Sequence, residues 1–271
     1  VIPDSVVMPR AEIHTAKNGV KIYTLQSDDF EVVRFSFVFR AGTSMQHKPF
    51  TASATLNMLS EGSRSMTAQQ IAETLDFYGT YFDANIDRDY VYISLALLTK
   101  FCDNVFPVLR DIILNPAFNE SELRTYSNKR QQGLAIERRK IEVQSRELFG
   151  QALFGAEHPY GESADESLYD NLTREDLVEL YNELYTAENC FVVRSGNIDH
   201  SVISNLKQIV EALPSGRKPE VTLPKPETTY SIRKPIDTAV QSSIRIGRLL
   251  FPRSHPDFVG MQVVAMILGG Y

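Results

Sequence analysis

The sequence feature that most constrains the fold is an alternation of large apolar side chains within residues 30–42. Val33, Phe35, Phe37 and Phe39 occupy every second position. Successive side chains of a β-strand point to opposite faces of a sheet, so these four share one face. A wholly apolar strand face is stable only when other elements cover it. The pattern therefore predicts a sheet strand with one buried face.

Helix signals follow the strand signals along the chain. Thr67 is expected to cap a helix that Gly79 ends, and Thr173 with Asp176 is expected to form a capping box at the start of another. Further patterns predict helices over residues 51–59, 101–116, 119–155, 199–216 and 255–270, and strands within residues 18–27, 81–98, 189–198 and 239–251.

Composition limits the classes of partner. The chain has 271 residues, of which 43% are hydrophobic and 23% charged, as in a soluble globular protein. A net charge of −6 lacks the basic surface that nucleic acids require. No apolar run approaches the roughly 20 residues of a membrane span. The first ten residues contain no secretory signal, so a cytoplasmic location is the default expectation, and a periplasmic one stays open.

Two cysteines, Cys102 and Cys190, are too few for a disulfide framework. Both lie in apolar surroundings in the sequence, so we expect buried free thiols.

A change in composition suggests where the chain divides. Residues 215–235 hold four of the 13 prolines and almost no large aliphatic side chains, which is typical of a linker. We place the linker at residues 217–230, after a first domain of residues 1–216. Residues 231–271 then begin a second segment. It contains a strand pattern followed by a helix pattern, the same order as at residues 34–62. Because such a pair cannot bury its apolar face alone, we expect the sequence to be a fragment.

The predicted helix at residues 51–59 carries the main candidate site. Ser53, Leu56 and Asn57 lie three and four residues apart, which places them on one helical face. A zinc metallopeptidase has two histidines and a glutamate at this spacing.

A series of motifs resembles the insulinase/pitrilysin family of zinc metallopeptidases, which includes the mitochondrial processing peptidase. They are FVFRAGTS, NMLSEGSRSMTAQQIAETLDFYGTYFDANIDRDY, NPAFNESEL, LFGAEHPYG, REDLVELYNELYTAENCFVVRSGNID and QSSIRIGRLLFPRSHPDF. The resemblance implies an α+β fold: an antiparallel-rich mixed sheet covered by helices, forming one half of a clamshell. It also implies that residues 231–271 are the truncated beginning of a second, homologous domain.

The same resemblance assigns roles to the helix. In active members an inverted H-x-x-E-H motif precedes a segment that matches NMLSEGS here. The alignment places the two zinc histidines at Ser53 and Asn57 and the general-base glutamate at Leu56. A hydroxyl and an amide are poor zinc ligands, and leucine cannot accept a proton. We therefore expect no catalytic residues and no metal or cofactor. The family's third ligand falls near residues 134–137, where Glu137 is either a relic or a surface residue.

Other histidines do not form a metal motif. None lies within helical reach of another; they are His14, His47, His158, His200 and His255. His158 and His200 are expected to lie in turns.

One strand has a possible binding role. The resemblance implies that YFDANIDRDYVYI, residues 81–93, corresponds to an edge strand along which a peptide backbone pairs, with Phe82, Asp83, Ala84 and Asn85 as binding positions. An ordinary sheet strand without a ligand is the alternative.

The sequence thus predicts a non-catalytic homologue of a zinc metallopeptidase. It would contribute a wall of a peptide-binding chamber to an active paralogous subunit, or form a homo-oligomer, and would bind peptides or unfolded polypeptides. Two alternatives stay open: a zinc-dependent peptidase with divergent ligands, and a structural scaffold subunit.

Overall fold

A computed structural model describes residues 9–27, 29–220, 222–237 and 240–269, apart from the side chains of residues 200 and 201. The chain divides into two compact units. Unit 1 comprises residues 1–137 and 164–223, and unit 2 comprises residues 138–163 and 224–271. Residues 138–163 thus group with the C-terminal part of the chain, whereas the sequence places them in the first domain. The domain limits at residues 216 and 230 stay predictions.

Unit 1 is built on a six-stranded sheet with the order β1-β2-β6-β3-β5-β4. Neighbouring strands are antiparallel except β2 and β6, which are parallel. This is the antiparallel-rich mixed sheet expected. The strands are β1 (Glu12–Thr15), β2 (Lys21–Gln26), β3 (Val32–Phe39), β4 (Tyr81–Ile86), β5 (Val91–Leu98) and β6 (Cys190–Gly196).

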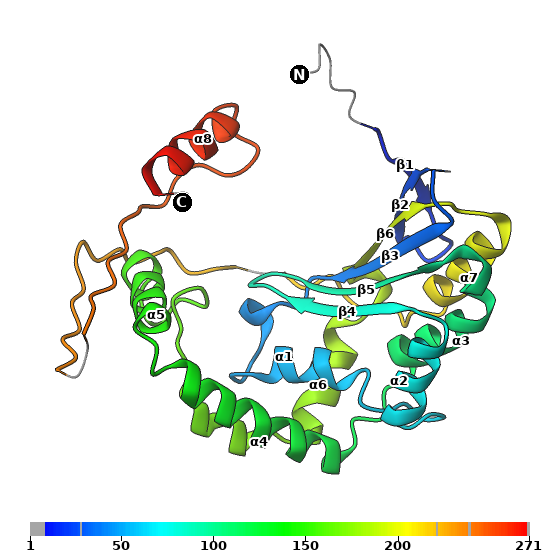
Figure 1. The fold of residues 1–271 in the computed structure, drawn as a ribbon, viewed down its shortest axis with the longest axis horizontal. Coiled ribbons are helices and arrows are strands. Elements are labelled where there is room, and N and C mark those ends of the chain that lie inside the picture. Colours follow the sequence, from blue (N-terminus) through cyan, green and yellow to red (C-terminus); the bar gives the residue numbers. More distant parts are fainter. Residues whose placement is uncertain (1–8, 28, 221, 238–239, 270–271) are drawn as a thin grey trace. The chain divides into compact units, whose positions relative to one another are not determined.

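Helices cover one face of this sheet (Figure 1). Val33, Phe35, Phe37 and Phe39 are all 0% exposed on that face, which confirms the predicted alternation. The helices of unit 1 are α1 (Thr51–Met58), α2 (Ala68–Phe77), α3 (Cys102–Leu114), α4 (Glu120–Glu137), α6 (Arg174–Leu184) and α7 (His200–Glu211), with short 3-10 turns η1 (Thr43–Met45), η2 (Thr99–Phe101), η3 (Glu166–Asn171) and η4 (Ala187–Asn189).

The predicted helix starts are confirmed. Thr67 forms a capping box with Gln70 before α2, and Thr173 forms one with Asp176 before α6. Each pair satisfies two backbone N–H groups that have no partner inside the helix.

The single helix predicted over residues 119–155 is wrong, because the chain leaves the helical conformation between α4 and α5 (Ile141–Phe154). No proline or glycine marks the break. Arg138 instead makes contacts that a continuous helix does not allow: its Nε donates to Glu147 at 3.2 Å, and its carbonyl oxygen accepts from Gln144 at 2.8 Å. These interactions outweigh the helix propensity of the segment.

Unit 2 contains α5 and α8 (Phe258–Gly269), together with irregular segments within residues 155–163 and 224–257. The predicted C-terminal helix is confirmed as α8, although Gly270 lies outside the described residues. The strand predicted over residues 239–251 is wrong: residues 240–251 join no ladder within the described chain, and Ala239 is not described. A strand is stable only with a partner strand, and none is paired with this segment. No helix among the described residues is both long and apolar enough to cross a bilayer.

Candidate functional site

Helix α1, which carries the candidate positions, is surrounded by other elements of unit 1. It packs against β4, α4 and α6 (Figure 1). The residue before it, Phe50, has a left-handed backbone with φ of 67°. The Phe50 ring stacks on Tyr169 of η3, with ring centroids 4.0 Å apart. This stacking stabilises an otherwise unfavourable conformation at the start of α1.

The three candidate positions on α1 are Ser53, Leu56 and Asn57. The two polar side chains among them donate hydrogen bonds to backbone carbonyl oxygens of the helix and its N-cap. Ser53 Oγ donates to the Phe50 carbonyl oxygen at 3.0 Å. Asn57 Nδ2 donates to the Ser53 carbonyl oxygen at 2.7 Å. Leu56 is 1% exposed and belongs to the hydrophobic core. Nothing on this face can act as a general acid or base.

This donor set does not fit the zinc ion that the family resemblance implies. Catalytic zinc is held by imidazole, thiolate or carboxylate groups, and a hydroxyl, an amide and an isobutyl group do not replace them. Across the part of the chain that the structure describes, no three His, Cys, Asp or Glu side chains gather closely enough to hold a metal. That residues 53, 56 and 57 are former motif positions stays a prediction.

Helix α4 directs Tyr126 and Arg130, rather than Glu137, toward this region. Tyr126 lies beside Ser53 and Arg130, and Arg130 interacts with the Tyr169 hydroxyl. Glu137 is the exposed last residue of α4. Sequence reasoning missed this cluster. The spacing of Tyr126 and Arg130 indicates a shared helical face, but nothing local indicates Tyr169.

The two tyrosine rings are held in place by aromatic packing. Tyr126 and Tyr169 meet edge to face, with centroids 6.4 Å apart. Burial, with the neighbouring Tyr169, raises the pKa of Tyr126 above its ordinary value, against opposing effects of Ser53 and Arg130. Tyr126 is therefore a neutral hydroxyl at neutral pH and retains a proton to donate.

Strand β4, the candidate peptide-binding strand, lies at one edge of the sheet, and its only partner strand among the described residues is β5. Asp87 N donates to the Tyr90 carbonyl oxygen at 2.9 Å. In an antiparallel pair every second residue forms hydrogen bonds with the partner strand, so Asn85 and Asp83 also bond to β5. The register then directs the N–H and C=O groups of Phe82, Ala84 and Ile86 away from β5. Asp83 and Asn85 face β5 with their backbones, and Asn85 Nδ2 donates to Asp83 Oδ2 at 2.6 Å. A peptide-binding role for these residues stays a prediction.

The turn between β4 and β5 is fixed by the segment that precedes α1. The N–H groups of Gly42 and Ser44 donate to the carbonyl oxygens of Asp89 and Arg88 at 3.0 and 2.7 Å. A Cβ atom on Gly42 would lie 2.5 Å from the Arg88 backbone. The glycine in AGTS is thus required for this close approach, which the sequence did not reveal.

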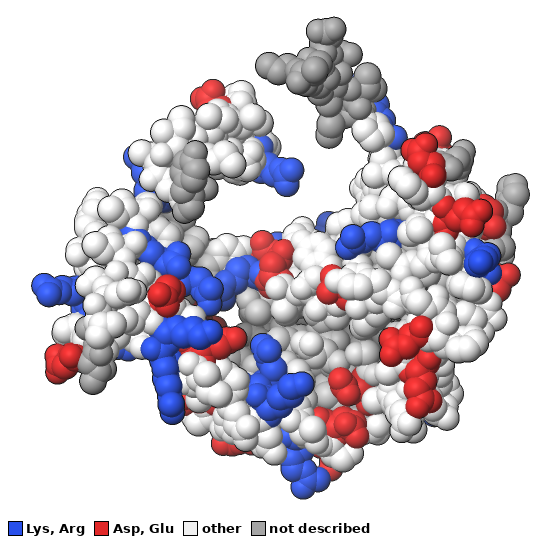
Figure 2. Space-filling view, in the orientation of Figure 1, with Lys and Arg blue, Asp and Glu red and all other residues white. Residues whose placement is uncertain are grey.

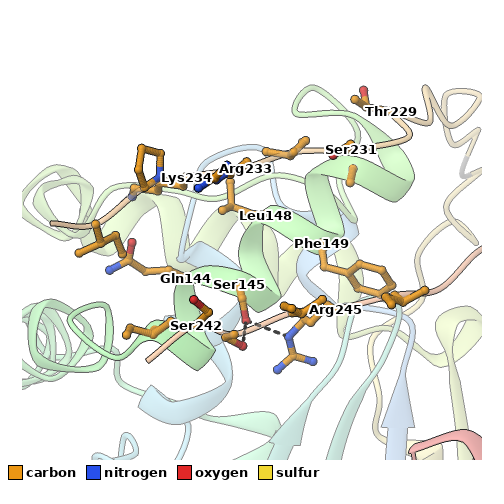
Figure 3. A pocket seen from close by; sticks show the side chains of 18 of the residues that line it. Gln144, Ser145, Leu148, Phe149, Thr229, Ser231, Arg233, Lys234, Ser242 and Arg245 are labelled. Carbon is orange, nitrogen blue, oxygen red and sulfur yellow. Dashed lines mark hydrogen bonds between the residues drawn. The ribbon is translucent and has the colours of Figure 1, made fainter. Parts of the chain in front are cut away.

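A cavity in unit 2 holds none of the candidate residues. It has a volume of about 850 Å³ and lies among α5 and the segments 228–237 and 241–247 (Figure 3). Ser145 Oγ accepts from Arg245 Nε at 3.1 Å and is 2.7 Å from Ser243 Oγ. Leu148 and Phe149 also line it. Asp237 is the one carboxylate among the residues that line it, and no group of three metal-ligating side chains occurs among the described residues. Because the cavity holds none of the candidate residues, we do not take it as the candidate site.

The remaining candidates have structural roles. His158 is buried in a turn of unit 2, where its Nδ1 accepts from the Tyr160 N–H at 3.0 Å. Cys102 and Cys190 are buried free thiols, as expected, and burial raises the pKa of Cys102 to about 12. A thiol with such a pKa stays protonated at neutral pH and is therefore unreactive.

The surface of unit 1 carries charge of both signs. Acidic side chains gather over the part that holds α2, α3 and β1 (Figure 2). The acidic residues of these elements are Glu12 of β1, Glu73 and Asp76 of α2, and Asp103 and Asp111 of α3. That the chain does not bind nucleic acid stays a prediction from its net charge.

Comparison with known proteins identifies the family. Residues 51–151 match the family described as insulinase (peptidase family M16), and residues 171–271 match the peptidase M16 inactive domain. The chain belongs to the insulinase/pitrilysin family of peptidases and their inactive homologues.

Related proteins carry both protease and processing-peptidase names. A protein of Rickettsia felis described as an uncharacterized zinc protease is 24% identical over 219 residues, covering 76% of this chain and 51% of that protein. Mitochondrial-processing peptidase subunit alpha-1 of Dictyostelium discoideum is 22% identical over 253 residues, covering 89% of this chain and 37% of that protein. The chain thus spans about half, or less, of the length of these relatives.

Solved structures share the fold. A peptidase M16 inactive domain from Pseudomonas fluorescens superimposes with a TM-score of 0.74 at 20% identity, covering 80% of this chain and 54% of that one. The first half of the periplasmic protease PqqL from Escherichia coli gives a TM-score of 0.67 at 15% identity, covering 80% of this chain and 50% of that one. Unit 1 is therefore built like one half of a clamshell peptidase, as the resemblance implied.

Proposed function

We propose that this chain is a non-catalytic member of its family, contributing a peptide-binding wall to an active paralogous subunit. One combination of observations carries the proposal. Helix α1 has no zinc ligand and no general base at residues 53, 56 and 57, whereas β4, which packs against the same helix, has one edge that no other described strand pairs with. Such an arrangement retains the means to bind a peptide backbone without the means to cleave it.

The proposed division of labour is physically reasonable. A chamber must enclose and order its substrate before cleavage, and a subunit without zinc can still supply binding surface. Relatives named mitochondrial-processing peptidase subunits alpha and beta support pairing with a paralogue. Zinc-dependent cleavage by this chain alone would instead favour the peptidase with divergent ligands, and a lack of peptide affinity would favour the scaffold.

Peptide binding along β4 can be tested with Ala84→Pro. The Ala84 N–H points away from β5, so proline removes a group that a peptide would use and leaves the β4–β5 ladder intact. Proline is tolerated at an edge strand, and Asp83 before it is already extended. We expect affinity for a fluorescein-labelled unfolded peptide, measured by anisotropy, to fall by about threefold or more.

Ala84→Val is the matched control, because it keeps the N–H group and suits a strand. It should bind peptide like the parent chain, and neither variant should gain cleavage activity. Equal affinity of the proline and valine variants would show that β4 is not the binding edge.

A further inference from the structure

The group of side chains between α4, α1 and η3 has no assigned role. It consists of Tyr126 and Arg130 from α4, Ser53 from α1, and Tyr169 from η3. Tyr169 is 3% exposed and packed between the rings of Phe50 and Tyr126. Arg130, in contrast, is exposed. The cluster therefore has a rigid aromatic base and a guanidinium that solvent and ligands can reach.

The hydroxyl of Tyr126 is an unsatisfied donor. Tyr126 Oη is shielded from solvent and makes no hydrogen bond of good geometry, although Ser53 and Arg130 lie beside it. Ser53 Oγ donates its own proton to the Phe50 carbonyl oxygen, so it could only accept from Tyr126, and no such bond of good geometry forms. Buried polar groups without partners are uncommon in folded proteins, since each costs free energy. An unpaired buried hydroxyl next to a cation therefore indicates a place where a ligand completes the hydrogen bonding.

The available hydrogen-bonding groups select an anionic ligand. A guanidinium has donors only, so when Arg130 interacts with Tyr169 the phenol oxygen accepts and its proton stays free to donate. The Tyr126 hydroxyl also retains its proton. A planar guanidinium with adjacent hydroxyl donors matches a carboxylate, which accepts several hydrogen bonds in one plane.

Neighbouring acids do not fill the site. Asp170 Oδ2 accepts from Gln131 Nε2 at 3.0 Å, so that carboxylate already has a partner. Glu137 lies seven residues beyond Arg130 on α4, where its charge acts on Arg130 without a hydrogen bond to it. The guanidinium thus keeps donors for a ligand.

We propose that Arg130 and Tyr169, supported by Tyr126, form a binding site for a carboxylate of the peptide that this chain holds. The inference rests on the proposed peptide-binding function and adds the chemical class that the wall recognises. Helix α1 packs against both β4 and α4, so the edge strand and the helix that carries Tyr126 and Arg130 contact the same helix. The carboxylate comes from an aspartate or glutamate side chain or from the peptide C-terminus.

The experiment compares unfolded peptides that differ in one group. Fluorescein-labelled peptides with a central Glu or Gln, each with a free or amidated C-terminus, are titrated with the full chain at low and high ionic strength. At low ionic strength we expect a carboxylate to improve the dissociation constant by about tenfold. An effect of the central Glu identifies a side-chain carboxylate, and an effect of the free terminus identifies the C-terminal one.

Variants assign the effect to this cluster. Arg130→Gln should abolish the carboxylate preference, and Tyr169→Phe should reduce it while keeping the ring stacked. Lys129→Gln is the matched control, because it removes a positive charge from the exposed residue of α4 directly before Arg130. It should leave the preference intact. A preference that survives Arg130→Gln, or one that Lys129→Gln removes equally, overturns the proposal.

A small probe separates this proposal from the proposed function. N-acetylglutamate should shift the Arg130 Nε–Hε resonance in an NMR titration, and N-acetylglutamine should not. Equal binding of all peptides overturns the carboxylate site but leaves peptide binding. A shifted resonance without peptide binding supports the carboxylate site and rejects the proposed function. If the resonance does not shift and no peptide binds, both the carboxylate site and the proposed function are rejected.

Discussion

At the scale of single residues, Asp111 shows how one carboxylate connects distant segments. Ser65 Oγ donates to Asp111 Oδ2 at 2.6 Å and Asn115 Nδ2 donates to Oδ1 at 3.0 Å, while Ser63 Oγ is a further donor. The two serine bonds join the loop after α1 to α3. Partial burial alone would raise the pKa of Asp111, but the hydrogen bonds lower it below the ordinary value.

Asp111→Asn should destabilise the protein in a pH-dependent way. A lowered folded-state pKa means that the carboxylate contributes stability above its unfolded pKa, about 4, and loses it as pH falls through the folded pKa. At neutral pH we expect a loss of about 1–3 kcal/mol in the free energy of unfolding. Urea unfolding should show the difference between variant and parent shrinking below about pH 4. A difference that is constant with pH would contradict this account.

Residue roles were predictable where they follow from local spacing. The inward faces of Val33 and Phe35 follow from period two, and both are 0% exposed. The spacing also placed Ser53 and Asn57 on one face of α1. The contact of Arg130 with Tyr169 did not follow, because it joins elements that are distant in sequence and depends on how η3 packs.

At the scale of elements, two glycines should respond oppositely to alanine. Gly133 lies inside α4, where an added Cβ meets nothing within 4 Å. Gly133→Ala should therefore stabilise the protein by about 1 kcal/mol, since alanine loses less conformational entropy in a helix.

Gly42→Ala should destabilise by about 1–3 kcal/mol, because its Cβ would overlap the backbone of the β4–β5 turn. Urea unfolding monitored by circular dichroism checks both variants. Equal stability of the two would show that the close approach at Gly42 is unimportant.

Element starts were easier to predict than element ends. The capping residues Thr67 and Thr173 define helix starts through local hydrogen bonds. The break between α4 and α5 depends on Arg138 and its contacts with Glu147 and Ser163, which no local pattern encodes. The strand pattern at residues 239–251 also failed, because a strand requires a partner.

At the scale of the whole molecule, the sequence indicated the layers but not the strand order. Strand β6 lies between β2 and β3, although β2 ends at Gln26, β3 ends at Phe39 and β6 begins only at Cys190. Such long-range pairing is set by the packing of the complete core. The family resemblance, rather than local pattern, supplied the fold class.

Metal removal should leave the protein unchanged under the proposed function. We expect protein purified without added metal to contain far less than one zinc ion per chain by mass spectrometry, because residues 53, 56 and 57 provide no suitable ligands. Treatment with EDTA should alter neither the thermal unfolding midpoint nor peptide affinity. Stoichiometric zinc whose loss lowers either quantity would instead support a peptidase with divergent ligands.

The open edge of β4 has a consequence for solution behaviour. Its outward N–H and C=O groups, at Phe82, Ala84 and Ile86, do not distinguish a peptide from a strand of a neighbouring molecule. Under the proposed function, we expect self-pairing to compete with peptide for the same edge in concentrated samples. The apparent peptide affinity should weaken as the sample is concentrated and recover on dilution, and bound peptide should protect the protein from aggregation.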